Sequence, residues 1–284
     1  QIADLHKIAA MMVGTYTGGS VNLVAMSDAF GASGDMVSSS VVADNLLMAL
    51  YFFVLIAIPT IEFFLKKFKH PYIDEVEARK ASGEGENQAA SYWKAKPVAL
   101  IDIAEALAIA FAIVAISTAI ADFFAGLIPT SNFGLSLLNG LLGNKYLIMP
   151  TLTMLLATIK PEFMGNIGGA QEIGTFLIHI FFAVIGVPAS IYLIMTQAPL
   201  LLVFCAIIVG MNMIFSFVFG KIFKFNLEEI CIASNANIGG PTTAAALAIA
   251  KGWQAMVVPA LLVGTLGYVI GNYYGIFVGT FLGR

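Results

Sequence analysis

The chain has 284 residues, of which 59% are hydrophobic and only 11% are charged. Soluble domains usually carry about 25% charged residues, so this composition excludes an ordinary soluble fold. The formal net charge of −3 gives no indication of nucleic-acid binding.

Long runs without charged residues indicate membrane-spanning helices. A span needs about 20 apolar residues, and its backbone groups must be hydrogen-bonded within the segment, which favours helices. We therefore predict an all-α, polytopic membrane protein. In chain order, we expect an interrupted helix over 6–31, a span over 36–61, a polar stretch over 66–96, a span over 98–121, a Gly/Ser/Asn-rich connection over 126–144, a short apolar segment over 146–159, spans over 170–196 and 198–220, a second interrupted helix over 226–251 and a last span over 253–283.

The polar stretch contains seven of the fourteen Lys and Arg residues. Because cytoplasmic loops carry an excess of these residues, we expect it on the cytoplasmic side. It divides the chain into the end of a first repeat (1–64), a cytoplasmic loop (65–97) and a second repeat (98–284), and each repeat has its own broken helix.

Two predicted spans carry small residues at every fourth position, a spacing that lets another backbone approach closely. In the first they are Ala104, Ala108 and Ala112, and in the last they are Gly267, Gly271, Gly275, Gly279 and Gly283. We predict that both stripes serve helix packing, and a glycine-laddered surface also permits a homodimer. Cys205 and Cys231 lie in apolar runs, where buried free thiols are expected rather than a disulfide.

The most informative pattern is an internal repeat. The sequence Thr-Gly-Gly-Ser-Val-Asn spans residues 17–22, and Ile-Gly-Gly-Pro-Thr-Thr spans 238–243, so that Gly239 follows Gly18 by 221 positions. A helical Gly costs about 1 kcal/mol relative to Ala, and Pro241 lacks an N–H donor. Broken backbone at membrane depth is tolerated only where it is buried in protein or lines a wet cavity.

Interrupted helices at matching places in two halves are the best sequence indication of a transporter binding site. Half-helix N-termini offer N–H donors to anions, and frayed C-termini offer carbonyls to cations. The alternative is a pair of structural kinks with local caps. The candidate residues are Thr15, Thr17, Gly18, Gly19, Ser20 and Asn22 in the first break, and Ser234, Asn235, Asn237, Gly239, Gly240, Thr242 and Thr243 in the second.

Charged residues inside spans are functional candidates. Asp44 lies early in the first full span, where it would either bind a cation or carry a proton, or else lie at the membrane surface. Asp102 suits a helix N-terminus. No metal-ligand spacing, catalytic triad or phosphate-binding loop is present, so we expect neither an enzyme nor a cofactor, apart from coupling to Na⁺ or H⁺.

The repeat also leads us to expect about 100 further residues upstream, because several spans precede the second break and few residues precede the first. Whether the repeats are inverted depends on segment 146–159. If this segment crosses the membrane, five spans lie between the two broken helices, which then run parallel. An inverted repeat needs four or six intervening spans.

Several motifs together resemble the YjcL-like bacterial membrane proteins, a family known as a domain of unknown function. They are the stretches 16–22, 168–174, 181–183, 233–244, 252–253 and 267–273. The family is distantly similar to sodium/proton antiporters and bile-acid symporters, in which two broken helices cross in a core that moves against a scaffold. The resemblance implies elevator-type alternating access in a bacterial inner (cytoplasmic) membrane.

The sequence therefore predicts a cation-coupled secondary transporter for a small solute, an organic anion being favoured because helix N-termini suit carboxylates. A channel or passive pore is one alternative. A membrane sensor or assembly partner, contacted through the polar loop, is another.

Overall fold

The computed structural model describes residues 4–81, 97–129, 131, 133–170, 172–174, 176–177, 180 and 199–283, and this part of the chain contains helices and no β-strand. The elements are α1 (Leu5–Gly18), α2 (Val21–Ala29), α3 (Gly34–Ala57), η1 (Ile58–Thr60), α4 (Glu62–Lys67), α5 (Pro71–Ala81), α7 (Leu100–Leu127), α8 (Phe133–Leu142), α9 (Lys145–Ile159), α10 (Pro161–Gly165), α13 (Pro199–Ile222), α14 (Leu227–Lys251), η2 (Gln254–Met256) and α15 (Val257–Leu282).

Four segments of the described chain are long and apolar enough to cross a membrane: Gly34–Thr60, Leu100–Leu127, Pro199–Ile222 and Gln254–Leu282. They match four of the predicted spans. The predicted short segment 146–159 is α9, and the predicted span 170–196 falls almost entirely outside the described residues. The chain is thus an all-α membrane protein, as the sequence predicts.

Two predicted irregular segments contain helices instead. The connection 126–144 carries α8, because apolar residues at helical spacing run through its Gly, Ser and Asn positions. The polar stretch begins at the end of α4 and continues with α5. It contacts the start of α14, where the Leu227 amide donates to the Lys69 carbonyl (2.8 Å) and the Ile73 amide donates to Glu228 Oε1 (2.8 Å).

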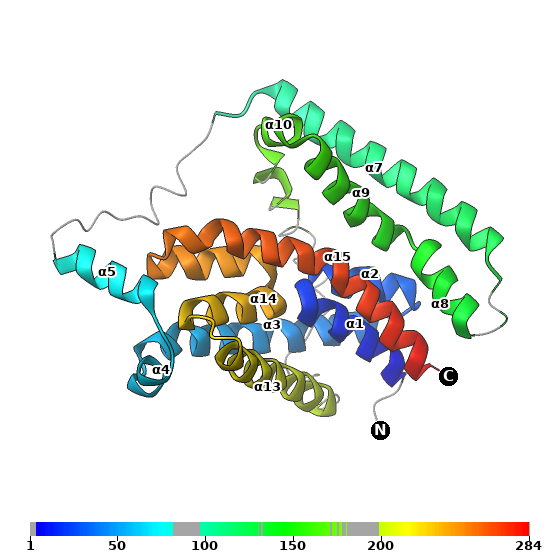
Figure 1. The fold of residues 1–284 in the computed structure, drawn as a ribbon. Coiled ribbons are helices and arrows are strands. Elements are labelled where there is room, and N and C mark those ends of the chain that lie inside the picture. The colour runs from blue at the N-terminus through cyan, green and yellow to red at the C-terminus, as the bar shows by residue number, and fades with distance from the viewer. Residues whose placement is uncertain are drawn as a thin grey trace.

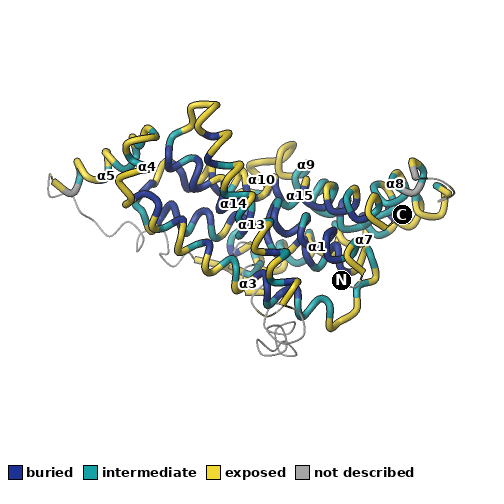
Figure 2. Tube along the Cα trace, turned by 90° about the horizontal axis from the view of Figure 1, so that it is seen from below, coloured by how far each residue is buried: buried dark blue, intermediate teal, exposed yellow. Residues whose placement is uncertain are grey.

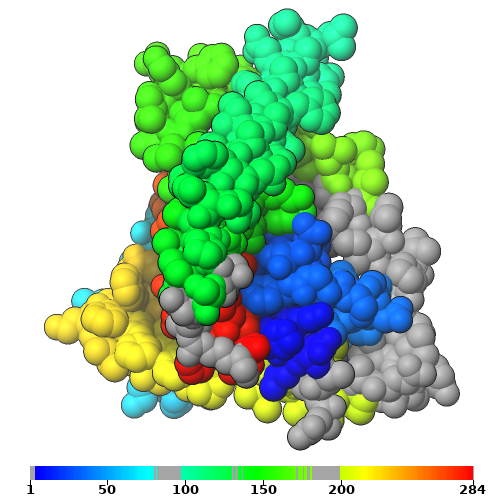
Figure 3. Space-filling view, turned by 90° about the vertical axis from the view of Figure 1, so that its right-hand side faces the viewer, coloured from blue at the N-terminus to red at the C-terminus, as the bar shows by residue number. Residues whose placement is uncertain are grey.

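The helices form two layers (Figure 1). The first layer contains α1 to α3 and α13 to α15, with α15 in contact with α1, α2 and α14. The second contains α7 to α10 and contacts the first through α15, which touches both α8 and α9. Figure 3 shows the red end of α15 beside the dark blue end of α1, with the green helices of the second layer above them.

Burial is concentrated in the first layer. Figure 2 shows dark blue segments along α1, α14 and α15, whereas α4 and α5 are mainly exposed or intermediate. Cys205 and Cys231 are both free and buried within this layer, as predicted. In the second layer, Asp102 occupies the first turn of α7 and its Oδ2 accepts from the Ala99 amide (2.8 Å), which confirms its expected place at a helix N-terminus.

Candidate functional site: the crossing of two interrupted helices

Both glycine pairs interrupt the helical backbone at their second residue. Gly19 separates α1 from α2 with φ 109° and ψ 166°, and Gly240 interrupts α14 with φ 77° and ψ −172°. This region of backbone space is essentially restricted to glycine. Pro241 follows Gly240 and, lacking an N–H, cannot restore the helical hydrogen bond there.

The two interruptions meet in space. A Cβ atom built on Gly19 would lie 2.9 Å from the Gly240 Cα, and one built on Gly240 would lie 3.0 Å from the Gly18 carbonyl oxygen. The backbones are therefore in direct contact. As a result, four helix ends meet at this point. Two are C-terminal, those of α1 and of the first half of α14, and two are N-terminal, those of α2 and of the second half of α14.

The glycine stripe of α15 packs over this crossing. A Cβ on Gly267 would lie 2.6 Å from the Thr17 carbonyl oxygen and 2.7 Å from the Gly18 Cα. Next to it, Gly264 leaves room for the backbone of Pro241. The predicted packing role of the stripe is thus confirmed, since a side chain at these positions would collide with backbone atoms.

Tyr268 reaches both interruptions, a placement that the sequence did not reveal. Its ring carbon Cε1 would lie 3.4 Å from a Cβ on Gly19, and its hydroxyl oxygen 3.4 Å from a Cβ on Gly240. The only sequence signal is an aromatic residue directly after Gly267 in the glycine stripe. Tyr268 therefore borders the crossing from the α15 side.

Asp44 connects α3 to the first interruption. Its side chain is 1% exposed, and its Oδ2 accepts a hydrogen bond from Ser20 Oγ (2.6 Å). Its other oxygen, Oδ1, makes no hydrogen bond of good geometry in the described chain, and the Tyr16 hydroxyl lies beside the carboxylate. Burying a carboxylate is costly unless it is paired or hydrogen-bonded, so this second oxygen is suited to a cation or a proton.

Other buried polar atoms on the surrounding helices also lack hydrogen-bond partners in the described chain. They are Thr15 Oγ1, Ser40 Oγ and Asn235 Nδ2, whereas the buried Tyr16 hydroxyl lies beside the Asp44 carboxylate and Cys205. Such atoms are few in native proteins, and contact with a bound water or ion is one usual explanation for them. Tyr16 and Ser40 were not candidates in the sequence: Tyr16 stands between the candidates Thr15 and Thr17 but was not chosen, and Ser40 lies far from either break.

Several of the other sequence candidates are hydrogen-bonded to backbone. Thr17 Oγ1 donates to the Val13 carbonyl (2.7 Å), Thr243 Oγ1 donates to the Gly240 carbonyl (3.2 Å), and Asn22 Nδ2 donates to the carbonyls of Gly14 (3.1 Å) and Gly267 (3.3 Å). Asn22 thus joins α2 to α1 and α15, whereas Thr17 and Thr243 bond only within their own helices, which fits the local-cap alternative at those two positions.

The remaining candidates lie in different surroundings. Ser234 is buried and joins Tyr51 and Asn212 in a hydrogen-bonded group between α3, α13 and α14. Asn237 and Gly239 are half-buried, and Thr242 is exposed. The crossing therefore brings Gly18, Gly19 and Gly240 together directly, with Asp44 linked to it through Ser20. Within the described residues, no cluster of three or more His, Cys, Asp or Glu side chains could hold a metal ion.

Known proteins resemble this chain along its whole length. The family model described as "Protein of unknown function (DUF819)" matches residues 1–284. The chain belongs to this family. It is also 49% identical over 278 residues to the protein named "Uncharacterized membrane protein YjcL" of Bacillus subtilis (strain 168), an alignment that covers 98% of this chain and 68% of that protein. No solved structure matches the chain.

Proposed function

We propose that this chain forms the solute-binding part of a cation-coupled secondary transporter. The observation that carries the proposal is the backbone contact between Gly19 and Gly240, where two helices are interrupted at the same point. Transporters bind substrates and coupling ions at discontinuous helices, whose termini supply free N–H and C=O groups. Gly19 and Gly240 both adopt a backbone conformation that is almost exclusive to glycine. Such conformations are costly and persist only where the surrounding structure requires them.

The proposed coupling site is the carboxylate of Asp44. Ser20 fixes one of its oxygens beside the first interruption, and Oδ1, which makes no hydrogen bond of good geometry, would take up either Na⁺ or H⁺ with the Tyr16 hydroxyl close to the carboxylate. A buried ionisable residue in a spanning helix is a functional candidate by default. Because Ser20 stands directly after Gly19, a change in the charge of Asp44 would act on the backbone at the break.

The proposed movement is an elevator-type shift of the first layer against α7 to α10. The first layer is held together by backbone contacts between α1, α14 and α15, whereas the second layer touches it mainly through α8 and α9. Rigid-body movement of one packed unit past another is one established form of alternating access. The half-helix N-termini at the crossing favour an organic anion as the solute.

The coupling site can be tested before the solute is known. Ligands that bind only the folded state raise its stability, by about 2.7 kcal/mol at one hundred times the dissociation constant. We expect NaCl to raise the unfolding temperature of the purified protein relative to choline chloride at equal ionic strength. If the coupling ion is a proton, a step to lower pH should raise it instead. Asp44→Asn should abolish this response and keep the protein folded.

The matched control is Asp35→Asn, which removes an exposed carboxylate from the first turn of the same helix. It should respond to the ion as the native protein does. An identical response of the native protein and Asp44→Asn would refute the assignment. Ion conductance in planar bilayers without any coupled solute flux would instead favour a passive pore.

A further inference from the structure

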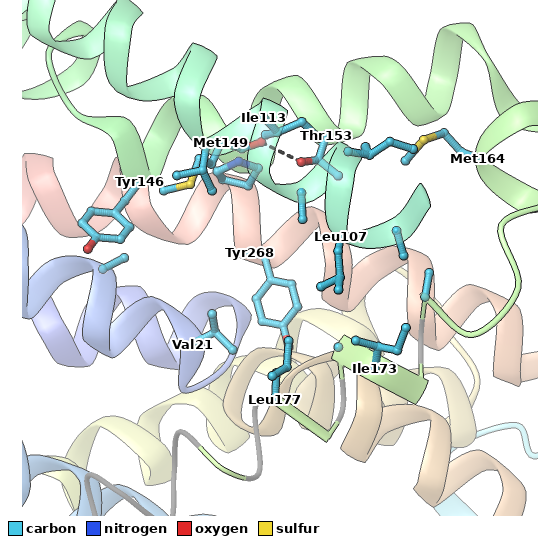
Figure 4. A pocket seen from close by; sticks show the side chains of 18 of the residues that line it. Val21, Leu107, Ile113, Tyr146, Met149, Thr153, Met164, Ile173, Leu177 and Tyr268 are labelled. Atoms are coloured by element: carbon cyan, nitrogen blue, oxygen red, sulfur yellow. Dashed lines mark hydrogen bonds between the residues drawn. The ribbon is translucent and has the colours of Figure 1, made fainter. Parts of the chain in front are cut away.

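A cavity of about 690 Å³ lies beside the crossing, between the two layers. Its walls come from α2 and α15 on one side and from α7, α9 and the residues after α10 on the other. Figure 4 shows Tyr268 reaching into it, with Leu107 and Ile113 of α7 and Met149 of α9 around it. The volume falls within the range of about 300–1,000 Å³ that is typical of small-molecule sites.

The cavity is lined almost entirely by hydrocarbon. None of its described lining residues is charged, and the polar ones are Asn22, Tyr146, Thr153, Tyr268 and Asn272. Two of these already have backbone partners: Thr153 Oγ1 donates to the Met149 carbonyl (2.8 Å), and the Asn22 amide donates to two carbonyls. A small, strongly hydrated ion would lose its water here without replacement. An apolar body would be favourably buried.

Asn272 gives this apolar cavity a specific polar contact. Its side chain is 3% exposed, and Nδ2 donates to the Tyr146 carbonyl (3.0 Å), which fixes the orientation of the amide. The opposite atom, Oδ1, has no hydrogen-bond partner in the described chain. A carbonyl oxygen can only accept, so a complementary ligand must bring an O–H or N–H group.

We propose that the transported solute binds in this cavity and is amphipathic, with an apolar body against α7 and α9 and an O–H or N–H group donating to Asn272. This inference rests on the proposed transport function and narrows its solute: an amphipathic donor takes the place of a small polar organic anion, because none of the described lining residues is charged. Tyr268 lies between the cavity and the two interruptions, so that a bound body would press on the same ring that touches Gly19 and Gly240.

The experiment is a fluorescence titration of the protein in lipid nanodiscs, with empty nanodiscs as the baseline. The probes are 2-naphthol and 2-methoxynaphthalene, which share one apolar body but differ in the O–H donor, and succinate as a small polar anion. We expect 2-naphthol to bind about tenfold more tightly than its ether, because the ether leaves a buried acceptor unpaired. Succinate should not displace it.

Three variants locate the binding. Asn272→Leu should make the two naphthalene probes bind alike. Ala110→Trp should fill the cavity and abolish binding, whereas Ala112→Trp, also an exposed position of α7 but outside the cavity lining, should leave binding unchanged. Because Asn272 also holds Tyr146, the Ala110 and Ala112 pair keeps the test valid if Asn272→Leu does not fold.

Equal binding of alcohol and ether to the native protein, equal loss in both tryptophan variants, or displacement by succinate would overturn the inference. The first two outcomes would indicate that membrane lipid or hydrophobic partitioning fills the space. The titration does not involve the coupling ion. A failure of the Asp44 experiment with 2-naphthol binding intact would therefore remove the coupling proposal and leave the cavity as a binding site.

Discussion

The crossing in the first layer and the α7 to α10 layer are both built from apolar helices, yet they pack in different ways. Within the most apolar 18-residue window of α15, 39% of the residues are buried, whereas the figure for α7 is 6%. Glycines bring backbones into contact at the crossing, and larger side chains leave a cavity of about 690 Å³ beside α7 and α9.

This difference shows what determines tight packing in a membrane protein. Lipid is as apolar as the helices, so hydrophobicity does not drive them together, and close contact depends on small residues and hydrogen bonds. The stripe of α15 meets the backbone of another helix and locks the crossing. The layer of α7 to α10 has little such contact with the first layer, as the proposed solute site and the proposed movement require.

The largest effect is expected from Gly18→Ala. The added Cβ would overlap the Gly267 carbonyl carbon and lie 2.5 Å from the Tyr268 amide nitrogen, and neither backbone atom can move aside alone. Overpacking costs about 1–3 kcal/mol where side chains can adjust, so here we expect the upper end or complete loss of folded protein. The yield of monodisperse protein and its unfolding temperature provide the measurement.

Gly210→Ala is the control for that substitution. Gly210 lies within α13, and a Cβ added there would have no other atom within 4 Å, so alanine should stabilise the helix by up to about 1 kcal/mol. If Gly18→Ala and Gly210→Ala unfold at the same temperature, the close contact of α1 with α15 does not exist.

A smaller loss of stability is expected from Gly240→Ala at the second break, where backbone strain is the main cost. Gly240 and Gly252 have nearly equal φ angles of 77° and 75°, but their ψ angles are −172° and 16°. The angles of Gly252 lie in the left-handed helical region, which costs an L-residue about 1–2 kcal/mol. We expect Gly240→Ala to lose about 3 kcal/mol and Gly252→Ala about 1 kcal/mol, compared by thermal unfolding in one detergent. Equal losses would show that the backbone at Gly240 is not specially constrained.

The sequence revealed features that depend on local chemistry. Apolar runs without charge predicted the four long spans, and the adjacent glycines followed by Ser20 or Pro241 predicted where α1–α2 and α14 are interrupted. Whether the two halves are true repeats, and inverted ones, stays a prediction.

Features that arise from tertiary contact were not visible. Tyr268 belongs to the site only because α15 crosses both breaks, and Asn272 only because α9 comes near it. Conversely, Thr17 and Thr243 looked like free ligands in the sequence, yet each hydroxyl bonds to the carbonyl of a residue three or four positions earlier. The composition of a polar cluster does not tell whether its hydroxyl groups already have partners.

The smallest effect on stability is expected in the layer of α7 to α10, from Ala108→Leu. The stripe of Ala104, Ala108 and Ala112 was predicted to pack against another helix, but all three residues are exposed within the described chain, and this part of the prediction is wrong there. A substitution at a position without neighbours usually changes stability by less than about 0.5 kcal/mol.

Thermal unfolding of the full-length protein would measure this effect, with Phe111→Leu as a control because Phe111 is 69% exposed on the same helix. Two unchanged unfolding temperatures would support a lipid-facing α7 that is free to act as a scaffold. A drop for Ala108→Leu alone would mean that a helix outside the described residues, or a second copy of the protein, covers the stripe. In that case tight small-residue packing would occur on both sides of the cavity, and the layer of α7 to α10 would be held on its outer face, as a fixed scaffold in the proposed elevator movement would be.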